Sequence, residues 1–94
     1  MFTAEEIIDY VSENNPDATI FTCPDFNEVI VGWVENRYGL PVVCYSYYMM
    51  VESLAQDYDD AEDPIIDAIE WINYNTLRTL PYIYEAGRPV ILYN

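Results

Sequence analysis

The sequence contains no histidine and no lysine. Without histidine the chain lacks the usual general base near neutral pH, and a cysteine–histidine nucleophile is excluded. Without lysine there is no amine for Schiff-base chemistry. The remaining titratable side chains are chiefly carboxylates, and carboxylates on exposed helix faces keep their ordinary ionisation, which makes them poor acid–base catalysts. We therefore expect a protein that is not an enzyme and has no catalytic residues.

Other scarce features exclude further classes. The two cysteines, Cys23 and Cys44, lie in apolar stretches without C-x-x-C spacing, so we expect free buried thiols in a reducing cytosol. The three glycines stand alone at positions 32, 39 and 87, which leaves no glycine-rich phosphate loop. No apolar run reaches the ~18–20 residues that span a bilayer, and the start lacks a signal-peptide pattern. The sequence thus predicts a soluble, cytoplasmic protein without a cofactor.

Acidic residues are abundant: seventeen Asp and Glu against three Arg give a net charge of −14 in 94 residues. Eight acids lie in residues 1–35 and seven in residues 57–70, both without a base, and the remaining two acids and three arginines sum to +1. The chain is nevertheless 52% hydrophobic and 16% aromatic, unlike disordered sequences. Residues 1–94 are therefore expected to form one folded domain that repels phosphate and does not itself bind nucleic acid.

Local patterns in the first half predict one helix and a β-meander. Thr3 and Glu6 form a capping-box pattern before a helix over residues 4–14, which the Asn-Pro-Asp sequence at 15–17 ends. Residues 18–23 and 28–35 are rich in β-branched and aromatic side chains and are predicted strands. Turn residues at 36–39 and a strand over 40–45 complete a hairpin.

The second half predicts two more helices and a final strand. Ser46 can cap a helix that carries apolar side chains at three- and four-residue steps, and Asp63-Pro64 starts another. Ile65, Ala68, Ile69, Ile72 and Thr76 share one side of this last helix, which Pro81 ends or kinks; residues 89–93 form a strand of unknown neighbour. The order α-β-β-β-α-α-β predicts an α+β domain with an antiparallel sheet of three to four strands.

The acids form rows on two of these helices. Asp63, Asp67 and Glu70 step by four and three residues opposite the isoleucines, and no Lys or Arg follows to pair with them. Charges at such steps are separated by about 5 Å, comparable with the roughly 3.4 Å axial rise between phosphates of one DNA strand. The candidate partner-binding residues are Asp60, Asp63, Asp67, Glu70, Tyr74 and Tyr58, with Trp71 as flanking contact area, and Glu6, Asp9 and Glu13 as a second row.

Three simpler interpretations stand beside this one. A run of like charges is usually a solvated face. Acidity can reflect adaptation to high salt, although ten tyrosines do not fit such a surface. The acids at 57, 59 and 62 resemble part of a calcium loop, but the loop glycine and the closing bidentate glutamate are absent, so we expect no metal site. Tyrosines, in turn, are frequent at protein interfaces and in cores alike.

One stretch carries a family resemblance. Residues 68–83, AIEWINYNTLRTLPYI, and residues 88–93, RPVILY, resemble the C-terminal signature W-I-x-YNT-x-R-x-LPY of small acidic proteins encoded by bacteriophages and integrative elements, especially of Firmicutes. The family is uncharacterised as a whole. The resemblance therefore implies a setting, namely a mobile-element protein acting inside a bacterial host cell, and says nearly nothing about activity.

Charge and setting together favour one function. The expectation is an inhibitor of a host nucleic-acid-binding defence protein, an anti-CRISPR or anti-restriction protein that mimics nucleic-acid charge. Its partner would be a basic host nuclease or CRISPR effector, bound through electrostatic steering. The alternative is a non-catalytic interaction or assembly module, with Arg78 pairing with a carboxylate at its helix end and homodimer formation left open.

Overall fold

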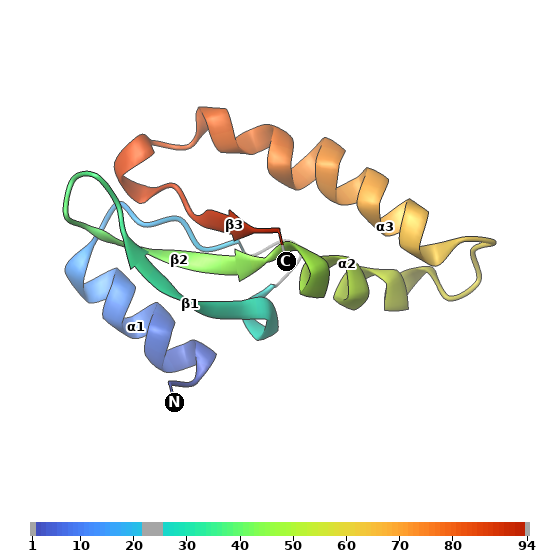
Figure 1. Cartoon of the computed structure of the whole chain (residues 1–94), viewed down its shortest axis with the longest axis horizontal. Helices are drawn as coiled ribbons and strands as arrows, with labels where there is room; N and C mark the ends of the chain where they lie inside the picture. The colour runs from blue at the N-terminus through green and yellow to red at the C-terminus, as the bar shows by residue number, and fades with distance from the viewer. Residues whose placement is uncertain (1, 22–25, 94) are drawn as a thin grey trace.

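A mixed three-stranded sheet lies at the centre of the molecule, in the order β1-β2-β3 (Figure 1). The computed structural model describes residues 2–21 and 26–93. β1 (Ile30–Glu35) pairs antiparallel with β2 (Pro41–Ser46), whereas β3 (Val90–Leu92) pairs parallel with β2. The α+β fold is confirmed, but the expectation of an antiparallel sheet is wrong for β3, because the chain returns from the last helix to the same end of β2 at which β2 starts.

The hairpin between β1 and β2 forms at the predicted turn. The backbone N–H of Asn36 donates to the carbonyl of Leu40, and the Asn36 side-chain oxygen accepts from the backbone N–H groups of Tyr38 and Leu40. Gly39 has a φ of 73°, a left-handed conformation that glycine adopts without a steric cost. The turn composition of this segment therefore determines the register in which Glu35 faces Pro41.

Helix α1 (Ala4–Asn14) packs against β1 and β2. The Thr3 hydroxyl accepts from the Glu6 N–H and the Glu6 carboxylate accepts from the Thr3 N–H, so the predicted capping box is present. Ile7 and Val11, four residues apart, are buried toward the sheet. The amphipathic pattern thus places the acids of α1 on its outer side.

The segment after α1 differs from the prediction. Residues 18–21 form no strand, and residues 22 and 23, including Cys23, lie outside the described residues. The N–H of Thr19 donates to the carbonyl of Gly87, and the N–H of Phe21 donates to the Tyr45 hydroxyl. A turn and a side chain thus satisfy these donors where a neighbouring strand was expected. The other cysteine, Cys44, is a buried free thiol, as predicted, and burial raises its pKa.

Two packed helices extend from the sheet as an arm (Figure 1). α2 (Tyr47–Ala55) follows β2 directly, capped by Ser46, and continues into the short 3-10 helix η2 (Gln56–Tyr58). α3 (Pro64–Trp71) runs back along it. The molecule is consequently elongated, with extents of 44 × 30 × 22 Å.

The chain beyond α3 changes its helical type twice before it reaches β3. A π-helical segment, η3 (Ile72–Thr76), leads into a 3-10 helix, η4 (Leu77–Tyr82), which contains Pro81. α-Helical hydrogen bonding therefore ends at Trp71, ten positions before the proline that was expected to end or kink the helix. Two short 3-10 helices, η1 (Asn27–Val29) and η5 (Glu85–Gly87), complete the elements.

The core gathers around β2, which is buried along its whole length. Side chains of α1, α2 and α3 join it, among them Val11, Met50 and Ala68. On the predicted inner side of this last helix, Ala68 of α3 and Ile72 and Thr76 of η3 are buried, whereas Ile65 is 46% exposed. None of the helices within the described ranges combines the length and apolar character that a membrane-spanning helix needs.

Candidate functional site

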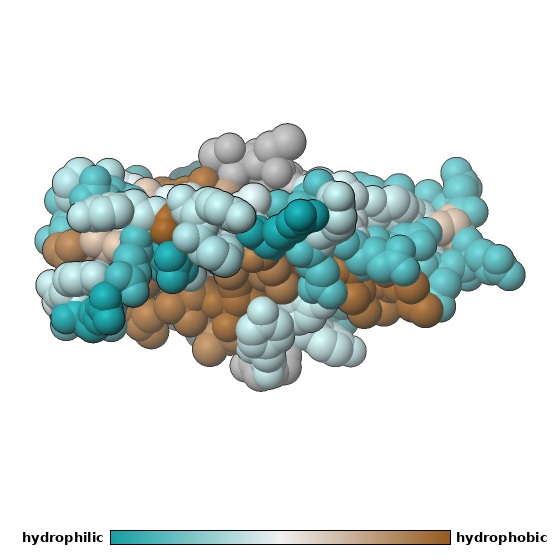
Figure 2. All heavy atoms as spheres, turned by 90° about the horizontal axis from the view of Figure 1, so that it is seen from above, coloured by the Kyte–Doolittle hydropathy of each residue, from teal (hydrophilic) through white to brown (hydrophobic). Residues whose placement is uncertain are grey.

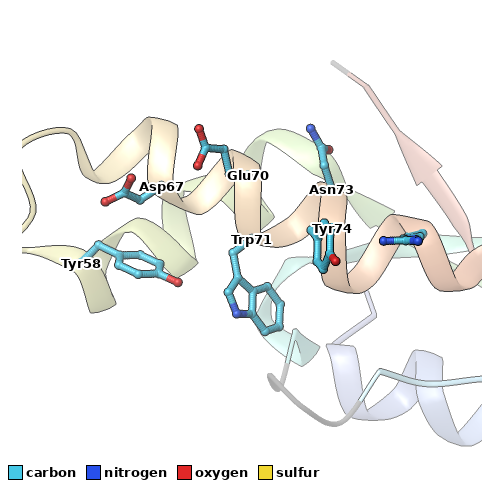
Figure 3. A pocket seen from close by; sticks show the side chains of 7 residues that line it. Tyr58, Asp67, Glu70, Trp71, Asn73 and Tyr74 are labelled. Carbon is cyan, nitrogen blue, oxygen red and sulfur yellow. The ribbon is translucent and has the colours of Figure 1, made fainter.

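An open groove of about 740 Å³ lies on the arm, between η2 and the run from α3 to η4. Figure 3 shows the Tyr58 ring extending toward the Trp71 indole, while the Asp67 and Glu70 carboxylates lie along the same stretch of α3. The residues that line the groove are Tyr58, Asp67, Glu70, Trp71, Asn73, Tyr74 and Arg78. Three aromatic rings and two carboxylates thus share one concave surface.

The local sequence explains this arrangement. Glu70 and Trp71 follow Asp67 by three and four residues, which places both of them beside Asp67 on the helix surface. The turn then widens at η3, where the Leu77 N–H donates to the Ile72 carbonyl five residues earlier. Wider turns of this kind are frequent at functional sites. Here the π-helical segment brings both Asn73 and Tyr74 to the groove.

The carboxylates of the groove have no cationic partner in the part of the chain that the structure describes. The ion pair found there joins Arg37 to Glu85, at the hairpin and η5. Arg78, which the alternative hypothesis paired with a carboxylate, instead places its guanidinium over the Tyr74 ring, 4.9 Å from the centroid. Asp67 and Glu70 are therefore left to solvent or to a binding partner.

Two of the predicted partner residues have structural roles. The Asp63 carboxylate caps α3 by accepting from the Ile66 N–H at 3.2 Å. The Glu6 carboxylate belongs to the capping box of α1, and the hydrogen bond from the Thr3 N–H lowers its pKa. Both side chains are exposed, yet substitution of either would disturb a helix start as well as the surface charge.

The two acidic rows do not form one surface. In Figure 1 the sheet lies between α1, which carries Asp9 and Glu13, and α3. Of the nine predicted residues, the groove brings together four, namely Tyr58, Asp67, Glu70 and Tyr74. Asp60 lies exposed in the connection between α2 and α3, three positions before the capping residue Asp63. The row on α1 is a separate acidic face.

Sequence reasoning missed two residues of the groove. Asn73 lies in η3, where its side-chain oxygen accepts a 3.3 Å hydrogen bond from the Tyr47 hydroxyl and so links η3 to α2. Arg78 follows Tyr74 by four positions, a spacing that extends the row of 67, 70, 71 and 74. The four-residue spacing could have identified Arg78. The sequence pattern did not predict the π-helical turn at η3 that exposes Asn73.

The chemistry of the groove favours binding of a cation. Aromatic faces attract cations, and unpaired carboxylates accept hydrogen bonds from ammonium or guanidinium groups. Among the residues that the structure describes, no three acidic or thiol side chains are grouped so that they could hold a metal ion. Comparison with protein families, with curated proteins and with solved structures gives no match. The resemblance of residues 68–93 to phage proteins therefore stays a prediction.

Proposed function

We propose that this protein inhibits a basic nucleic-acid-binding defence protein of a bacterial host by occupying its nucleic-acid site with the acidic surface of α3. The observation that carries the proposal is that Asp67 and Glu70 line an aromatic groove and have no ion-pair partner within residues 2–21 and 26–93. A cationic cleft would supply the counterions that this surface lacks. Such a role corresponds to an anti-CRISPR or anti-restriction protein.

The position of the arm supports this proposal. The connection between α2 and α3 forms one end of the elongated molecule, and that end is hydrophilic (Figure 2). Acidic side chains follow one another there, at positions 57, 59, 60, 62 and 63. A projecting acidic tip can enter a cleft that a flat acidic face could not, and the net charge of −14 would steer its approach.

The test compares the loss of two charges from the groove with the loss of two charges from α1. Asp67→Asn/Glu70→Gln removes two charges from the groove, and Asp9→Asn/Glu13→Gln removes two charges from α1. The substitutions avoid the capping residues Asp63 and Glu6, so both helix starts are retained. The immobilised wild-type protein is incubated with bacterial lysate at low salt, and a protein eluted by added salt is purified.

Displacement of a fluorescent DNA duplex from that purified protein is then measured. The proposal predicts displacement by the wild type and by the α1 variant. It predicts at least about tenfold weaker displacement by the groove variant, since two charge contacts of up to ~1 kcal/mol each are lost. Equal potency of the two variants, or binding to the purified protein without displacement of DNA, would refute it.

The alternative function, an interaction or assembly module, has its own observation. Hydrophobic side chains form a band along one long side of the molecule in Figure 2, and Ile65 and Ile66 of α3 are 46% and 51% exposed. Self-association through such a band would strengthen as salt screens the net charge. Light scattering after size-exclusion chromatography at about 0.05 and 0.5 M NaCl measures the oligomeric state. A protein that is monomeric at both salt concentrations does not assemble with itself.

A further inference from the structure

We propose that the groove binds the side chain of a single arginine from the partner, with its guanidinium between the aromatic rings of Tyr58 and Trp71 and within the negative field of the Asp67 and Glu70 carboxylates. This inference rests on the proposed function and specifies what its acidic surface recognises. A cleft that binds phosphate is rich in arginine. One arginine of that cleft would bind this groove in place of a phosphate.

The same molecule contains a simpler form of the proposed arrangement at another place. Near the hairpin, the Arg37 guanidinium lies over the Tyr38 ring, 5.0 Å from its centroid, and binds the Glu85 carboxylate at 2.8 Å. One tyrosine, through its ring and its hydroxyl, and one carboxylate thus hold a guanidinium on this surface. The groove presents the same two kinds of group, Trp71 and Tyr58 with Asp67 and Glu70, and no guanidinium of the described chain pairs with its carboxylates.

The geometry favours arginine over lysine. A guanidinium is planar, so it can stack on an aromatic ring while its edge donates to carboxylates, whereas an ammonium is a compact and strongly hydrated point charge. Tryptophan is the best aromatic partner for a cation, and Trp71 is partly buried against the core, which fixes its position. An open groove with one such ring and two carboxylates suits a flat cation.

Arg78 limits the groove to one guest cation. Its guanidinium already covers the Tyr74 ring at 4.9 Å, so that end of the groove carries a positive charge. A second cation there would meet like charge and an occupied aromatic face. The partner's arginine is therefore assigned to the end formed by Tyr58, Asp67, Glu70 and Trp71.

The experiment uses defined peptides in place of the unidentified partner. Acetyl-Gly-Arg-Gly-amide is titrated into the ¹⁵N-labelled protein, and the shift of the Trp71 indole N–H is followed by NMR. The Trp33→Phe variant identifies this signal, because the chain has two tryptophans. Peptides with citrulline, a neutral arginine analogue, and with lysine in the central position are the matched ligands.

The proposal predicts that the arginine peptide shifts the Trp71 signal and binds at least about fivefold more tightly than the citrulline peptide and about twofold more tightly than the lysine peptide. Asp67→Asn/Glu70→Gln should weaken arginine binding about fivefold, whereas Asp9→Asn/Glu13→Gln changes it less than about twofold. Equal binding of arginine and citrulline, equal binding of lysine, or equal weakening by both variants overturns the assignment.

This titration contains no partner protein, so its failure is distinct from failure of the proposed function. DNA displacement without arginine-peptide binding would refute the groove alone and leave charge mimicry in place. Peptide binding without DNA displacement would retain the arginine site and refute the inhibitor function.

Discussion

The Asn15 side-chain amide donates a 2.8 Å hydrogen bond to the carbonyl oxygen of Ala86, across 71 positions of sequence. The same amide donates to the carbonyl of Pro41 at 3.0 Å, and its oxygen accepts from the Asp17 N–H. Asn15 is 1% exposed. One buried side chain thus connects the end of α1, the start of β2 and the η5 turn before β3, and holds the parallel strand in place.

The first prediction concerns this connection. Asn15→Ala should lower the free energy of unfolding by about 2–4 kcal/mol, because a buried amide's hydrogen bonds are lost and carbonyl oxygens are left without its donors. Urea denaturation measures the change. Asn14→Ala is the matched control: that side chain is exposed and donates to Tyr10 within its own helix, so a loss below about 1 kcal/mol is expected. Similar losses for both variants would contradict a special role for Asn15.

The second prediction concerns Gly87 in the same region. A Cβ at this position would overlap the backbone carbonyl of Asp17 and lie 3.1 Å from Cα of Ala18. Backbone cannot move aside as a flexible side chain can, so Gly87→Ala should cost about 2 kcal/mol or more. At Gly32 a Cβ would meet no atom within 4 Å, and Gly32→Ala should be neutral or slightly stabilising. Calorimetry of the two variants compares them, and an unaltered Tm for Gly87→Ala would show that this close approach is absent.

The third prediction is a pH dependence at Glu85. The hydrogen bond from the Tyr38 hydroxyl, together with the nearby charge of Arg37, holds the pKa of this carboxyl below its ordinary value of 4.5. A lowered pKa in the folded state stabilises the fold above the ordinary value, and this contribution is lost as the pH falls through the folded-state pKa. The stability advantage of the wild type over Glu85→Gln should therefore shrink below about pH 4.5.

Denaturation by urea between about pH 6 and pH 3 gives this difference. The control substitution is Glu13→Gln, because Glu13 is exposed and has no hydrogen-bond or ion-pair partner among the described residues. Its difference from the wild type should not show the same loss on acidification. A Glu85→Gln difference that stays constant or grows on acidification would contradict the role of the Tyr38–Glu85–Arg37 group.

The fourth prediction concerns salt. Seventeen acids oppose three arginines, so repulsion within the folded chain dominates its surface electrostatics. Screening by NaCl should therefore stabilise the fold; if it contributes about 1 kcal/mol, Tm rises by about 4–8 °C between low salt and ~0.5 M. Thermal unfolding followed by circular dichroism tests this. The Asp9→Asn/Glu13→Gln variant should show a smaller rise, and a fall of Tm with salt would indicate that ion pairs dominate instead.

Elements defined by short-range chemistry were predictable from the sequence. The Thr3–Glu6 capping box, the Asp63-Pro64 helix start and the Asn36–Gly39 turn each depend on residues within four positions of one another. Helical spacing also placed Asp67, Glu70 and Tyr74 on one face, and all three line the groove.

Features that depend on distant residues were not predictable in the same way. The position of β3 depends on the hydrogen bonds from Asn15 to Ala86 and from Thr19 to Gly87, which form only after the chain has folded. Residues 18–21 have the composition of a strand, yet their donors are satisfied by Gly87 and Tyr45. The widened turn at η3 has no sequence signature either. The sequence therefore predicted a row of side chains on one helix but not the groove that they line.

The last prediction tests the assignment of Arg78. If this guanidinium repels a second cation and covers Tyr74, Arg78→Gln should raise the affinity for the arginine peptide about two- to fivefold, because a like charge is removed from the groove and an aromatic face is exposed. Arg37→Gln makes the same change of net charge at the hairpin, far from the groove in sequence and on a different element. NMR titration of both variants decides the matter: an equal gain means that net charge alone acts, and a weaker affinity in Arg78→Gln means that Arg78 supports the guest by holding Tyr74 in place.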